Sequence, residues 1–446
     1  IQGDCIQKMA EMDENSIDAV VTDPPYGLAF MGKSWDDFKP KEFQEFSYDW
    51  GKQALRVLKP GGYILAFCGT RTYHRMVVGL EDAGFEIKDQ IDWLYGSGFP
   101  KGYDIAKGID EKRGEKGEYI NDGDERGKNK FSGQMKSQHV GVGGSDYDCQ
   151  TPQAKKYDGW NTALKPAHEP IVVAQKPREG TYAENVLKFG TGGLNIDDCR
   201  IDTNEIKQRD TEQGEGSIFG NAPDDNMRWT GNGTAHEQGR YPANVLLDPQ
   251  AAKMLDEQSG NRPTGNITPY TQKSENENVD YAVVGEKRNI YHKGDKGGAS
   301  RFFYSSKAHK SERNAGLDDL ESKEGGSYEF RQDGSLDGHI PEDVKNNIAT
   351  LKPINLMRWL VRLVTPPDGI VLDPFAGSGT TGCACEIEKK DYILIEKRER
   401  FANLIAPKRC EYWSNPENWT ELKDHNELPN LEDKQKKNMY NTLENF

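Results

Sequence analysis

A short polar motif near the amino end of the chain has residue types suited to amine chemistry. It consists of Asp23, Pro24, Pro25 and Tyr26, and it directly follows an apolar run at residues 17–21. An exocyclic amine on a nucleobase is a poor nucleophile because its lone pair is delocalised into the ring. Two acceptors at its hydrogens, the Asp23 carboxylate and the Pro24 carbonyl fixed by the Pro-Pro turn, would favour the pyramidal geometry that attacks a methyl group. The Tyr26 ring would stack on the base, which must leave the duplex to reach it.

A second motif, rich in glycine, follows an apolar run at residues 370–372 near the other end of the chain. Its glycines satisfy the pattern GxGxxG, and a run with helical spacing follows them. In a Rossmann-type layout such glycines let a ligand approach the backbone, and an acid at the end of the next strand, here Glu396, binds a ribose diol. Asp373, ahead of the glycines, is suited to an α-ammonium group. These features favour S-adenosylmethionine, with a nicotinamide dinucleotide or a purely structural turn as alternatives. The motif comprises Gly377, Ser378, Gly379, Thr380, Thr381 and Gly382.

Residues 27–34 match the phosphate-binding pattern GxxxxGK[ST], but their context does not fit that function. A phosphate-binding loop needs a strand directly before its first glycine and a helix near its lysine. Here two prolines separate the strand from Gly27, and Pro40 would cut a helix short. We therefore expect this loop to border the target-base pocket, with Trp35 and Asp36 beside it.

The eight histidines show no spacing typical of catalysis. His168 and Glu169 stand at the start of a short apolar run, where a structural role at the edge of a strand is expected rather than that of a base. Methylation of an amine needs no strong general base, because the ammonium product releases its proton readily.

The elements that must position these motifs follow from hydrophobic periodicity. Residues 17–21, 63–67 and 87–94 are predicted strands, and residues 43–58 and 72–83 are predicted helices. The same alternation returns after residue 350, with helices at 354–364 and 380–388 and strands at 370–372 and 392–395. The predicted fold is α/β, a doubly wound and mostly parallel sheet with a large insertion. Ligands of such sheets bind beyond the carboxyl ends of the strands, where both motifs lie.

Six segments are predicted along the chain. Residues 1–100 form one half of the α/β domain, with the first motif, and 346–410 form the other half, with the second. A strand at 170–174 returns the chain to the sheet. The remaining predictions are a flexible loop at 101–160, the return segment at 161–200, an inserted recognition region at 201–345 and a charged tail at 411–446 with Trp413 and Trp419 as docking points.

The charge of the chain places a constraint on any polyanionic partner. A formal net charge of −15 over 446 residues argues against non-specific binding of nucleic acid by the whole surface, so a local basic patch is required. Residues 287–313 hold eight Lys or Arg against two acids, with aromatic residues between them. This mixture suits phosphate contact and base stacking, and a solvated basic loop is the alternative. The expected DNA contacts are Lys293, Lys296, Arg301, Lys307 and Lys310.

The cysteine content and the hydropathy of the chain indicate in which compartment the protein is expected. None of the seven cysteines forms a CxxC pair, so neither a metal site nor a disulfide framework is predicted. No apolar run reaches the ~18 residues of a membrane span, and no signal pattern is present at the amino end. The expected location is the reducing cytoplasm of a bacterial or phage-infected cell, with no membrane partner.

The motifs, in this order, resemble the β class of DNA amino methyltransferases, including phage- and prophage-borne members. In that class the target-base motif comes first, a recognition region lies between, and the cofactor motif comes last. The match covers roughly residues 1–100 and 346–410. The resemblance implies that Asp4 and Cys5 contact the adenine of the cofactor, that Lys352 lies in the segment closing over its methionine end, and that Phe375 and Glu396 also line its site.

The resemblance further implies S-adenosylmethionine as methyl donor and DNA as partner, with base flipping and a role in DNA modification. An aspartate at the first position of the motif is typical of adenine enzymes, so methylation of an adenine amine is expected. Cytosine N4 methylation is the alternative within the class, and a catalytically silent DNA-binding protein or an oxidoreductase is the alternative outside it. A homodimer is compatible with the sequence, which identifies no restriction endonuclease partner.

Overall fold

The computed structural model describes most of the chain. In several short strands far from the main sheet it describes the backbone but not the side chains. The described residues are 1–28, 36–96, 102–117, 147–203, 206–210, 239–263, 289–293, 295–306, 310–320, 323–325, 328–330, 336–339, 342–346 and 351–422.

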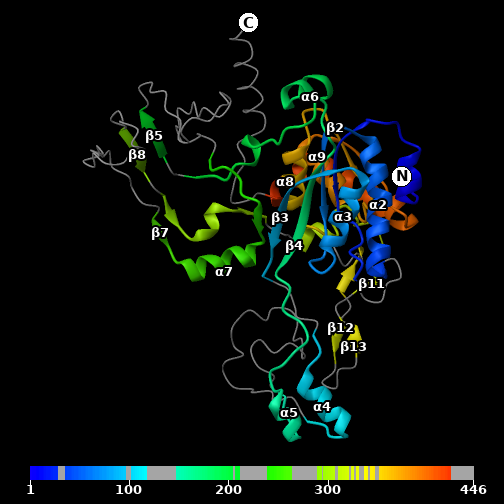
Figure 1. Cartoon of the computed structure of the whole chain (residues 1–446), viewed down its shortest axis with the longest axis vertical. Helices are drawn as coiled ribbons and strands as arrows, with labels where there is room; N and C mark the ends of the chain where they lie inside the picture. Colours follow the sequence, from blue (N-terminus) through cyan, green and yellow to red (C-terminus); the bar gives the residue numbers. More distant parts are fainter. Residues whose placement is uncertain are drawn as a thin grey trace, which may run out of the picture.

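An eight-stranded sheet forms the centre of the molecule (Figure 1). Its order is β10-β6-β3-β4-β2-β1-β15-β16, and β4 is antiparallel to both of its neighbours, whereas the other pairs are parallel. The prediction of a mostly parallel, doubly wound sheet is confirmed. The strands are β1 (Ile17–Thr22), β2 (Leu58–Phe67), β3 (Glu86–Leu94), β4 (His168–Gln175), β6 (Val245–Leu247), β10 (Tyr304–Ser305), β15 (Ile370–Asp373) and β16 (Asp391–Leu394).

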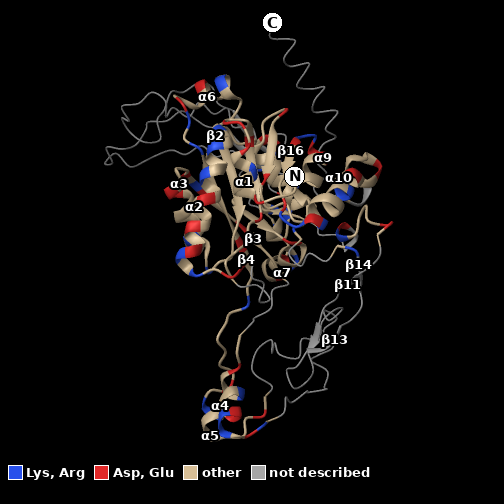
Figure 2. Ribbon diagram, turned by 90° about the vertical axis from the view of Figure 1, so that its right-hand side faces the viewer, with Lys and Arg blue, Asp and Glu red and all other residues tan. Residues whose placement is uncertain are grey.

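Helices cover both faces of this sheet because its central strands are apolar on both sides. In β2, Ile64 and Ala66 pack toward α2 (Pro40–Val57) and α3 (Tyr73–Ala83), whereas Leu65 and Phe67 pack toward the opposite face with α8 (Ile354–Val364) and α9 (Thr380–Glu388). Successive side chains of a strand point to opposite faces, so one strand contributes to both cores. Figure 2 shows the charged residues along the flanking helices and the largely uncharged central strands.

The pairing of β1 with β15 brings the two chemical motifs together. The strands run parallel, with Ala19 opposite Val371 and Val20 opposite Leu372. Their carboxyl ends therefore meet at one edge of the sheet, where ligands of this architecture bind. Thr22 Oγ1 donates a hydrogen bond of 2.6 Å to Asp373 Oδ1 across this edge. The motifs are far apart in sequence and adjacent in space.

Parts of the structure differ from the sequence-based expectation. The strand expected at 63–67 is longer in the structure, because β2 begins at Leu58, directly after α2. The strands β6 and β10 come from the region expected to be inserted, yet they extend the main sheet beside β3. The expected loop at 101–160 contains α4 (Ile105–Arg113) and α5 (Pro152–Lys156), which share a small core and project from the sheet domain.

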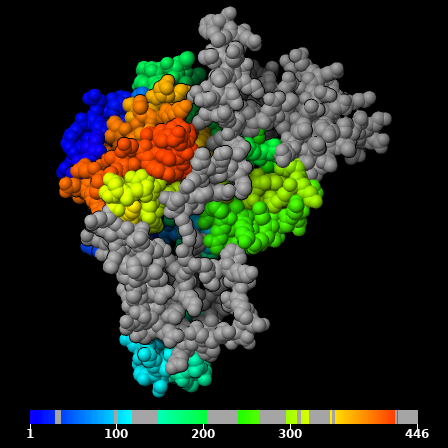
Figure 3. Space-filling view, turned by 180° about the vertical axis from the view of Figure 1, so that it is seen from behind, coloured from blue at the N-terminus to red at the C-terminus, as the bar shows by residue number. Residues whose placement is uncertain are grey.

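Part of the recognition region forms a lobe that is coloured green to yellow-green in Figure 3. It contains α7 (Pro249–Ser259), β7 (Arg262–Pro263), β9 (Lys296–Gly297) and η6 (Ala299–Phe302). Further pairs join β5 (Ile206–Asp210) to β8 (Asn289–Lys293), β11 (Lys323–Gly325) to β14 (Glu342–Val344) and β12 (Tyr328–Phe330) to β13 (Leu336–His339).

The segment after β16 packs against α9 instead of forming a free tail. A π-helical turn (Phe401–Ile405) leads into α10 (Ala406–Ser414), and a 3-10 helix (Pro416–Leu422) follows. Trp413, expected as a docking point, is 2% exposed and belongs to a core cluster with Trp419 at its margin. Residues 423–446 lie outside the described part. Shorter elements are α1 (Cys5–Ala10), α6 (Tyr182–Phe189), η4 (Asp197–Cys199) and η7 (Lys310–Arg313).

None of the helices in the described ranges combines the length and the apolar composition that crossing a bilayer requires.

Gly379 is predicted to be required for packing as well as for its place in the glycine motif. It caps the start of α9 with φ at +81°, and a Cβ built there would lie 2.7 Å from the Cβ of Ala406. Gly379→Ala should lower the free energy of unfolding by about 1–3 kcal/mol through backbone strain and overpacking. Urea unfolding measures the loss. Gly193→Ala is the matched control, because no atom lies within 4 Å of a Cβ there, and equal midpoints for the two variants would contradict the prediction.

Candidate active site

Four polar side chains meet at the carboxyl edge of the sheet: Asp23, Tyr26, Glu169 and Lys352. The Tyr26 hydroxyl lies 2.8 Å from Asp23 Oδ1 and 2.9 Å from Glu169 Oε2. The Lys352 ammonium lies 2.7 Å from Asp23 Oδ2, 3.2 Å from Glu169 Oε2 and 3.1 Å from the Tyr26 hydroxyl. We call these four residues the acid–lysine cluster.

Separate elements position the members of the acid–lysine cluster. Asp23 directly follows β1, Glu169 stands in β4, and Lys352 precedes α8. The start of α8 is anchored by Glu312, whose Oε2 accepts the Ile354 amide hydrogen at 3.0 Å. The Lys352 side chain is 8% exposed and its ammonium lies 4.9 Å from the centre of the Phe67 ring.

Burial and charge together set the protonation of this cluster. Burial raises the pKa of Asp23 above its usual value, although the neighbouring Lys352 ammonium acts in the opposite direction. Burial alone would lower the pKa of Lys352, but the carboxylates of Asp23 and Glu169 raise it to about 12. The pKa of the Tyr26 hydroxyl is raised well above its usual value by burial and by the same two carboxylates. Lys352 is thus charged and Tyr26 is neutral at physiological pH.

The backbone of the first motif is fixed from both sides. Thr72 Oγ1 donates a hydrogen bond of 2.6 Å to the Tyr26 carbonyl, and the Asp36 carboxylate accepts the amide hydrogens of Gly27 and Leu28. Pro24 is buried, and no described residue donates a hydrogen bond to its carbonyl oxygen. Buried carbonyls usually have a partner, so this oxygen is an acceptor suited to a ligand. Of the loop expected to border the pocket, residues 29–35 lie outside the described part.

The second motif brings several of the expected cofactor residues together. Gly377 has φ at +53°, and its amide donates a hydrogen bond of 2.9 Å to Glu396 Oε2. The Gly3 amide donates to the Glu396 carbonyl at 3.1 Å, so the segment with Asp4 and Cys5 lies beside Glu396. Asp4 caps α1 by accepting the Ile6 amide hydrogen. The amino-terminal segment and the acid after β16 therefore form one surface, as the family resemblance implies.

Other residues of the second motif face the protein interior. Thr381 and Thr22 donate hydroxyl hydrogen bonds to the two oxygens of Asp373, and burial raises the pKa of Asp373 to about 6. The Phe375 ring packs edge-on against Trp50, at 5.5 Å between ring centres. Ser378 and Thr380 accept hydrogen bonds from the fully buried Arg409 of α10. These residues fix the shape of the turn.

The sequence did not predict two features of the acid–lysine cluster. Lys352, expected at the methionine end of the cofactor, places its ammonium on Asp23 of the target-base motif. Glu169, expected to stabilise a strand edge, contacts Tyr26 and Lys352. The available signal was a glutamate directly before a run of buried residues, where a charged group is costly unless it has partners.

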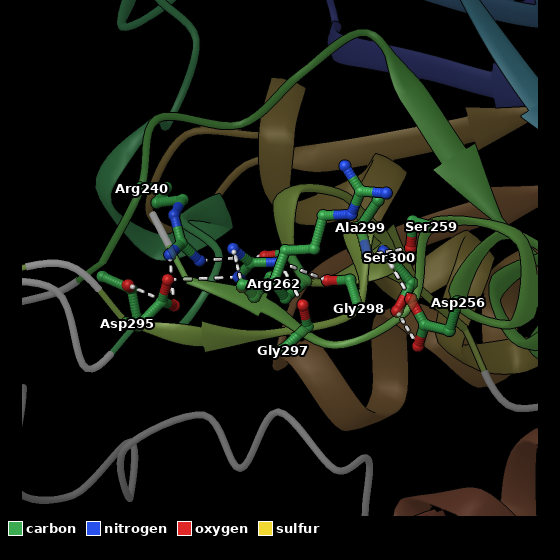
Figure 4. Close-up of polar contacts among 11 residues, drawn as sticks. Arg240, Asp256, Ser259, Arg262, Asp295, Gly297, Gly298, Ala299 and Ser300 are labelled. Carbon is green, nitrogen blue, oxygen red and sulfur yellow. Dashed lines mark hydrogen bonds and ion pairs between the residues drawn. The ribbon is translucent and has the colours of Figure 1, made fainter. Parts of the chain in front are cut away.

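The expected DNA contacts have different positions in the structure. Arg301 uses its donors inside the lobe, with Asp295 Oδ1 at 3.1 Å and the carbonyls of Gly297, Gly298 and Arg262 as further acceptors. Figure 4 labels these four partners, which lie close together. Arg240 forms an ion pair with the same Asp295. Most of the donors of Arg301 are therefore engaged within the lobe, and its contact with DNA stays a prediction.

The other expected DNA contacts that the structure describes lie on separate elements. Lys296 is exposed in β9, and the exposed Arg262 lies on the paired strand β7. Lys293 ends β8 and Lys310 begins η7, where only the backbone is described, and Lys307 lies outside the described residues. The pairing of β7 with β9, which the sequence did not reveal, adds Arg262 to the candidates.

Within the described ranges, no group of three or more His, Cys, Asp or Glu residues is arranged to hold a metal ion.

The doubly wound sheet, with an Asp-Pro-Pro-Tyr turn and a glycine turn at one edge, defines a protein of the methyltransferase class. A model of the DNA methylase family, which covers N6 and N4 enzymes, matches residues 17–407. The chain therefore belongs to this family of DNA methylases, which use S-adenosylmethionine as methyl donor.

Individual relatives match parts of the chain. The type II methyltransferase M.HindIII of Haemophilus influenzae is 26% identical over 230 residues, which are 43% of this chain and 63% of the relative. The type II methyltransferase M.HpaI of Haemophilus parainfluenzae is 36% identical over 103 residues, which are 23% of this chain and 33% of the relative. The chain thus matches less than two thirds of the length of either relative.

Solved structures similar to this chain include that of M1.HpyAVI, which is 14% identical with a TM-score of 0.35. The match covers 92% of this chain and 96% of that chain. The cytosine-N4-specific PvuII DNA methyltransferase is 13% identical with a TM-score of 0.38, and the match covers 92% of this chain and 89% of that one.

Lys352→Met is predicted to destabilise the protein in a pH-dependent manner. The substitution leaves two partly buried carboxylates without their cation, and removing one partner of a buried ion pair typically costs about 3–5 kcal/mol. Without the ammonium, the pKa of Asp23 in the folded state rises further above its unfolded value. At pH values between the pKa of Asp23 in the unfolded state and its pKa in the folded state, the folded state binds more protons. The free energy of unfolding therefore falls as pH rises through this range.

The loss of stability should therefore be larger at pH 8 than at pH 5, as measured by thermal unfolding at both values. Wild type should show no such loss from Lys352, whose own charge disappears only near its pKa of about 12. Lys253→Met, at a side chain that is 58% exposed, is the control. An equal loss at both pH values would show that the carboxylates do not depend on Lys352.

Proposed function

We propose that the protein transfers a methyl group from S-adenosylmethionine to the N6 amine of an adenine flipped out of DNA. The observation that carries the proposal is the pair of acceptors at the end of β1, the Asp23 carboxylate and the Pro24 carbonyl that has no described donor. The strand that they follow, β1, pairs with β15, which leads into the glycine turn. A hydrogen bond from Thr22 to Asp373 joins the ends of these two strands.

Asp23 and Pro24 would each accept one hydrogen of the target amine. Accepting both hydrogens moves the lone pair of the nitrogen out of conjugation and toward the methyl group. These interactions strengthen as the nitrogen becomes pyramidal, so they lower the barrier more than they improve ground-state binding. The Lys352 ammonium at 2.7 Å and the Tyr26 hydroxyl at 2.8 Å hold the two Asp23 oxygens in place before the base arrives.

The residues around the glycine turn fit S-adenosylmethionine. Glu396, 9% exposed at the end of β16, offers carboxylate oxygens to a ribose diol, and Asp4 and Cys5 lie beside it. The positive φ angles of Gly377 and Gly379 shape the turn at which the cofactor would approach the backbone. Asp373, ionised above its pKa of about 6, would attract the α-ammonium group. When bound, the cofactor supplies a methyl group on a positively charged sulfur.

The choice of adenine over cytosine rests on the aspartate at the first position of the motif. Cytosine N4 methylation uses the same pair of acceptors and is the second candidate. A catalytically silent DNA-binding protein is the third, and the complete set of Asp23, Pro24, Tyr26 and both glycines favours an active enzyme over it.

Duplex DNA would be held by the lobe that contains α7, β7 and β9. Lys296 and Arg262 are exposed on its paired strands, so they are placed to contact phosphates. Because phosphate contacts release counterions, replacing both residues with Gln should weaken binding and reduce its salt dependence.

Asp23→Ala is predicted to lower the rate of methyl transfer by about 100-fold or more, by analogy with the removal of one preorganised polar group. The affinity for S-adenosylmethionine should remain close to that of wild type, because Asp23 belongs to the target-base motif. Single-turnover transfer of a tritiated methyl group to DNA gives the rate, and calorimetry gives the affinity. Asp49→Ala, at an exposed position of α2, is the control.

Chromatography of the nucleosides after digestion identifies the product. We expect N6-methyladenine from wild type. Label recovered only as N4-methylcytosine would replace adenine by the second candidate, and an Asp23→Ala variant with wild-type turnover would refute the assignment of the acceptor.

A further inference from the structure

Two carboxylate oxygens of the acid–lysine cluster lie within hydrogen-bond distance of the Tyr26 hydroxyl, which can donate to only one of them. Tyr26 Oη lies 2.8 Å from Asp23 Oδ1 and 2.9 Å from Glu169 Oε2. A hydroxyl has a single hydrogen to donate. The Lys352 ammonium, 3.1 Å away, directs one of its own hydrogens at the same Tyr26 oxygen. With both carboxylates ionised, the Tyr26 hydrogen can therefore lie fully in only one of the two short oxygen–oxygen contacts.

One additional proton completes this hydrogen-bond network. If either carboxyl group carries a proton, it donates to Tyr26 while Tyr26 donates to the other carboxylate. Asp23 and Glu169 are thus connected through Tyr26 by two contacts of hydrogen-bond length. Burial also raises the pKa of Asp23, which favours holding a proton in the cluster.

We propose that Glu169 is the terminal acceptor of the proton that the target amine releases, and that this proton passes through Asp23 and Tyr26. The inference rests on the proposed function and extends it by one residue. As the bond between the amine nitrogen and the methyl carbon forms, the carbon–sulfur bond breaks and its electron pair stays on sulfur. The nitrogen then transfers one proton to Asp23. Asp23 passes a proton to the Tyr26 oxygen while Tyr26 passes its own hydrogen to Glu169, so Tyr26 ends neutral and unchanged.

Among the described residues, the other ionisable groups near the cluster do not offer an alternative acceptor. Burial raises the pKa of Cys68 and of Tyr95 to about 12, so both remain protonated. Lys352 is already charged. Asp373 has its oxygens engaged by Thr22 and Thr381.

Two further residues near the relay are also unsuited to this role. Asp36 accepts the amides of Gly27 and Leu28 with both of its oxygens. His168 precedes Glu169 in β4, so its side chain points to the other face of the sheet. The Glu169 side chain is 23% exposed, so a proton can return from it to solvent after product release. The Asp23 side chain is 20% exposed, but in the proposed function it contacts the target amine.

Two substitutions at Glu169 separate proton acceptance from positioning. Glu169→Gln keeps the size and the hydrogen bonds of the side chain but cannot take up a proton, whereas Glu169→Asp keeps the carboxylate but shortens its reach. A proton acceptor predicts that the Asp variant transfers methyl groups faster than the Gln variant. A residue that only positions Tyr26 predicts the reverse order.

The experiment measures single-turnover methyl transfer from S-adenosylmethionine to DNA at saturating concentrations, with the full chain. We expect Glu169→Gln to slow transfer by about 10- to 100-fold, in the lower range of general acid–base effects, with unchanged affinity for the cofactor. Tyr26→Phe removes the relay hydroxyl and should slow transfer comparably. Because both changes interrupt one path, the double variant should be no slower than the slower single variant. Glu81→Gln, exposed on α3, is the matched control.

A Glu169→Gln rate within twofold of wild type, a faster Gln than Asp variant, or losses that multiply in the double variant would each overturn the relay. These outcomes differ from a failure of the proposed function, in which wild type itself would yield no N6-methyladenine. Circular dichroism of each variant establishes that it is folded. If Glu169→Gln does not fold, the comparison of Glu169→Asp with Tyr26→Phe decides, since the relay requires the Asp variant to be the faster of the two.

Discussion

The parallel pairing of β1 with β15 is the constraint on which the rest of the site depends. It places an aspartate-containing turn and a glycine turn at the same edge of the sheet, although most of the chain separates them in sequence. Thr22 and Asp373 join the two turns by a buried hydrogen bond of 2.6 Å. In the proposed reaction the target base and the methyl donor must meet within bond-forming distance, and the adjacency of the two strands brings the two turns close together.

A second constraint is electrostatic. Lys352 carries the one positive charge of the acid–lysine cluster, where it faces two carboxylates and a tyrosine hydroxyl. Removing charges from water is costly, and such a group is tolerated only when its partners are close and well oriented. The arrangement keeps Asp23 within the pocket with its oxygens held. It also links the start of α8 to the end of β1, so the cofactor half and the target-base half of the domain are connected by charge as well as by the sheet.

The sequence predicted the elements with strong local signals. The bounds of α8 and α9 were predicted to the residue, and those of the central strands other than β2 nearly so, because apolar residues recur with the periods of helix and strand. The start of β2 was missed, because residues 58–62 have a pattern typical of the end of a helix. The two turns were predicted because proline and glycine restrict the backbone in recognisable ways.

By contrast, β6 and β10 are very short and lie in a polar region, and their place beside β3 depends on contacts that no local pattern records. The contacts of Glu169 and Lys352 with Tyr26 could not be predicted for the same reason, since these residues come from distant segments. Arg301 seemed available only because the sequence does not show that Asp295 and three carbonyls occupy its donors.

The central claim is that this member of the DNA methylase family methylates adenine at N6. Long-read sequencing of host DNA, from cells with and without expression of the chain, reports the modified base and its sequence context in one measurement. We expect N6-methyladenine at a defined sequence in expressing cells only, and its absence when Asp23→Ala is expressed at the same level. N4-methylcytosine at a defined sequence, or DNA identical in the two cultures despite folded protein, would contradict it.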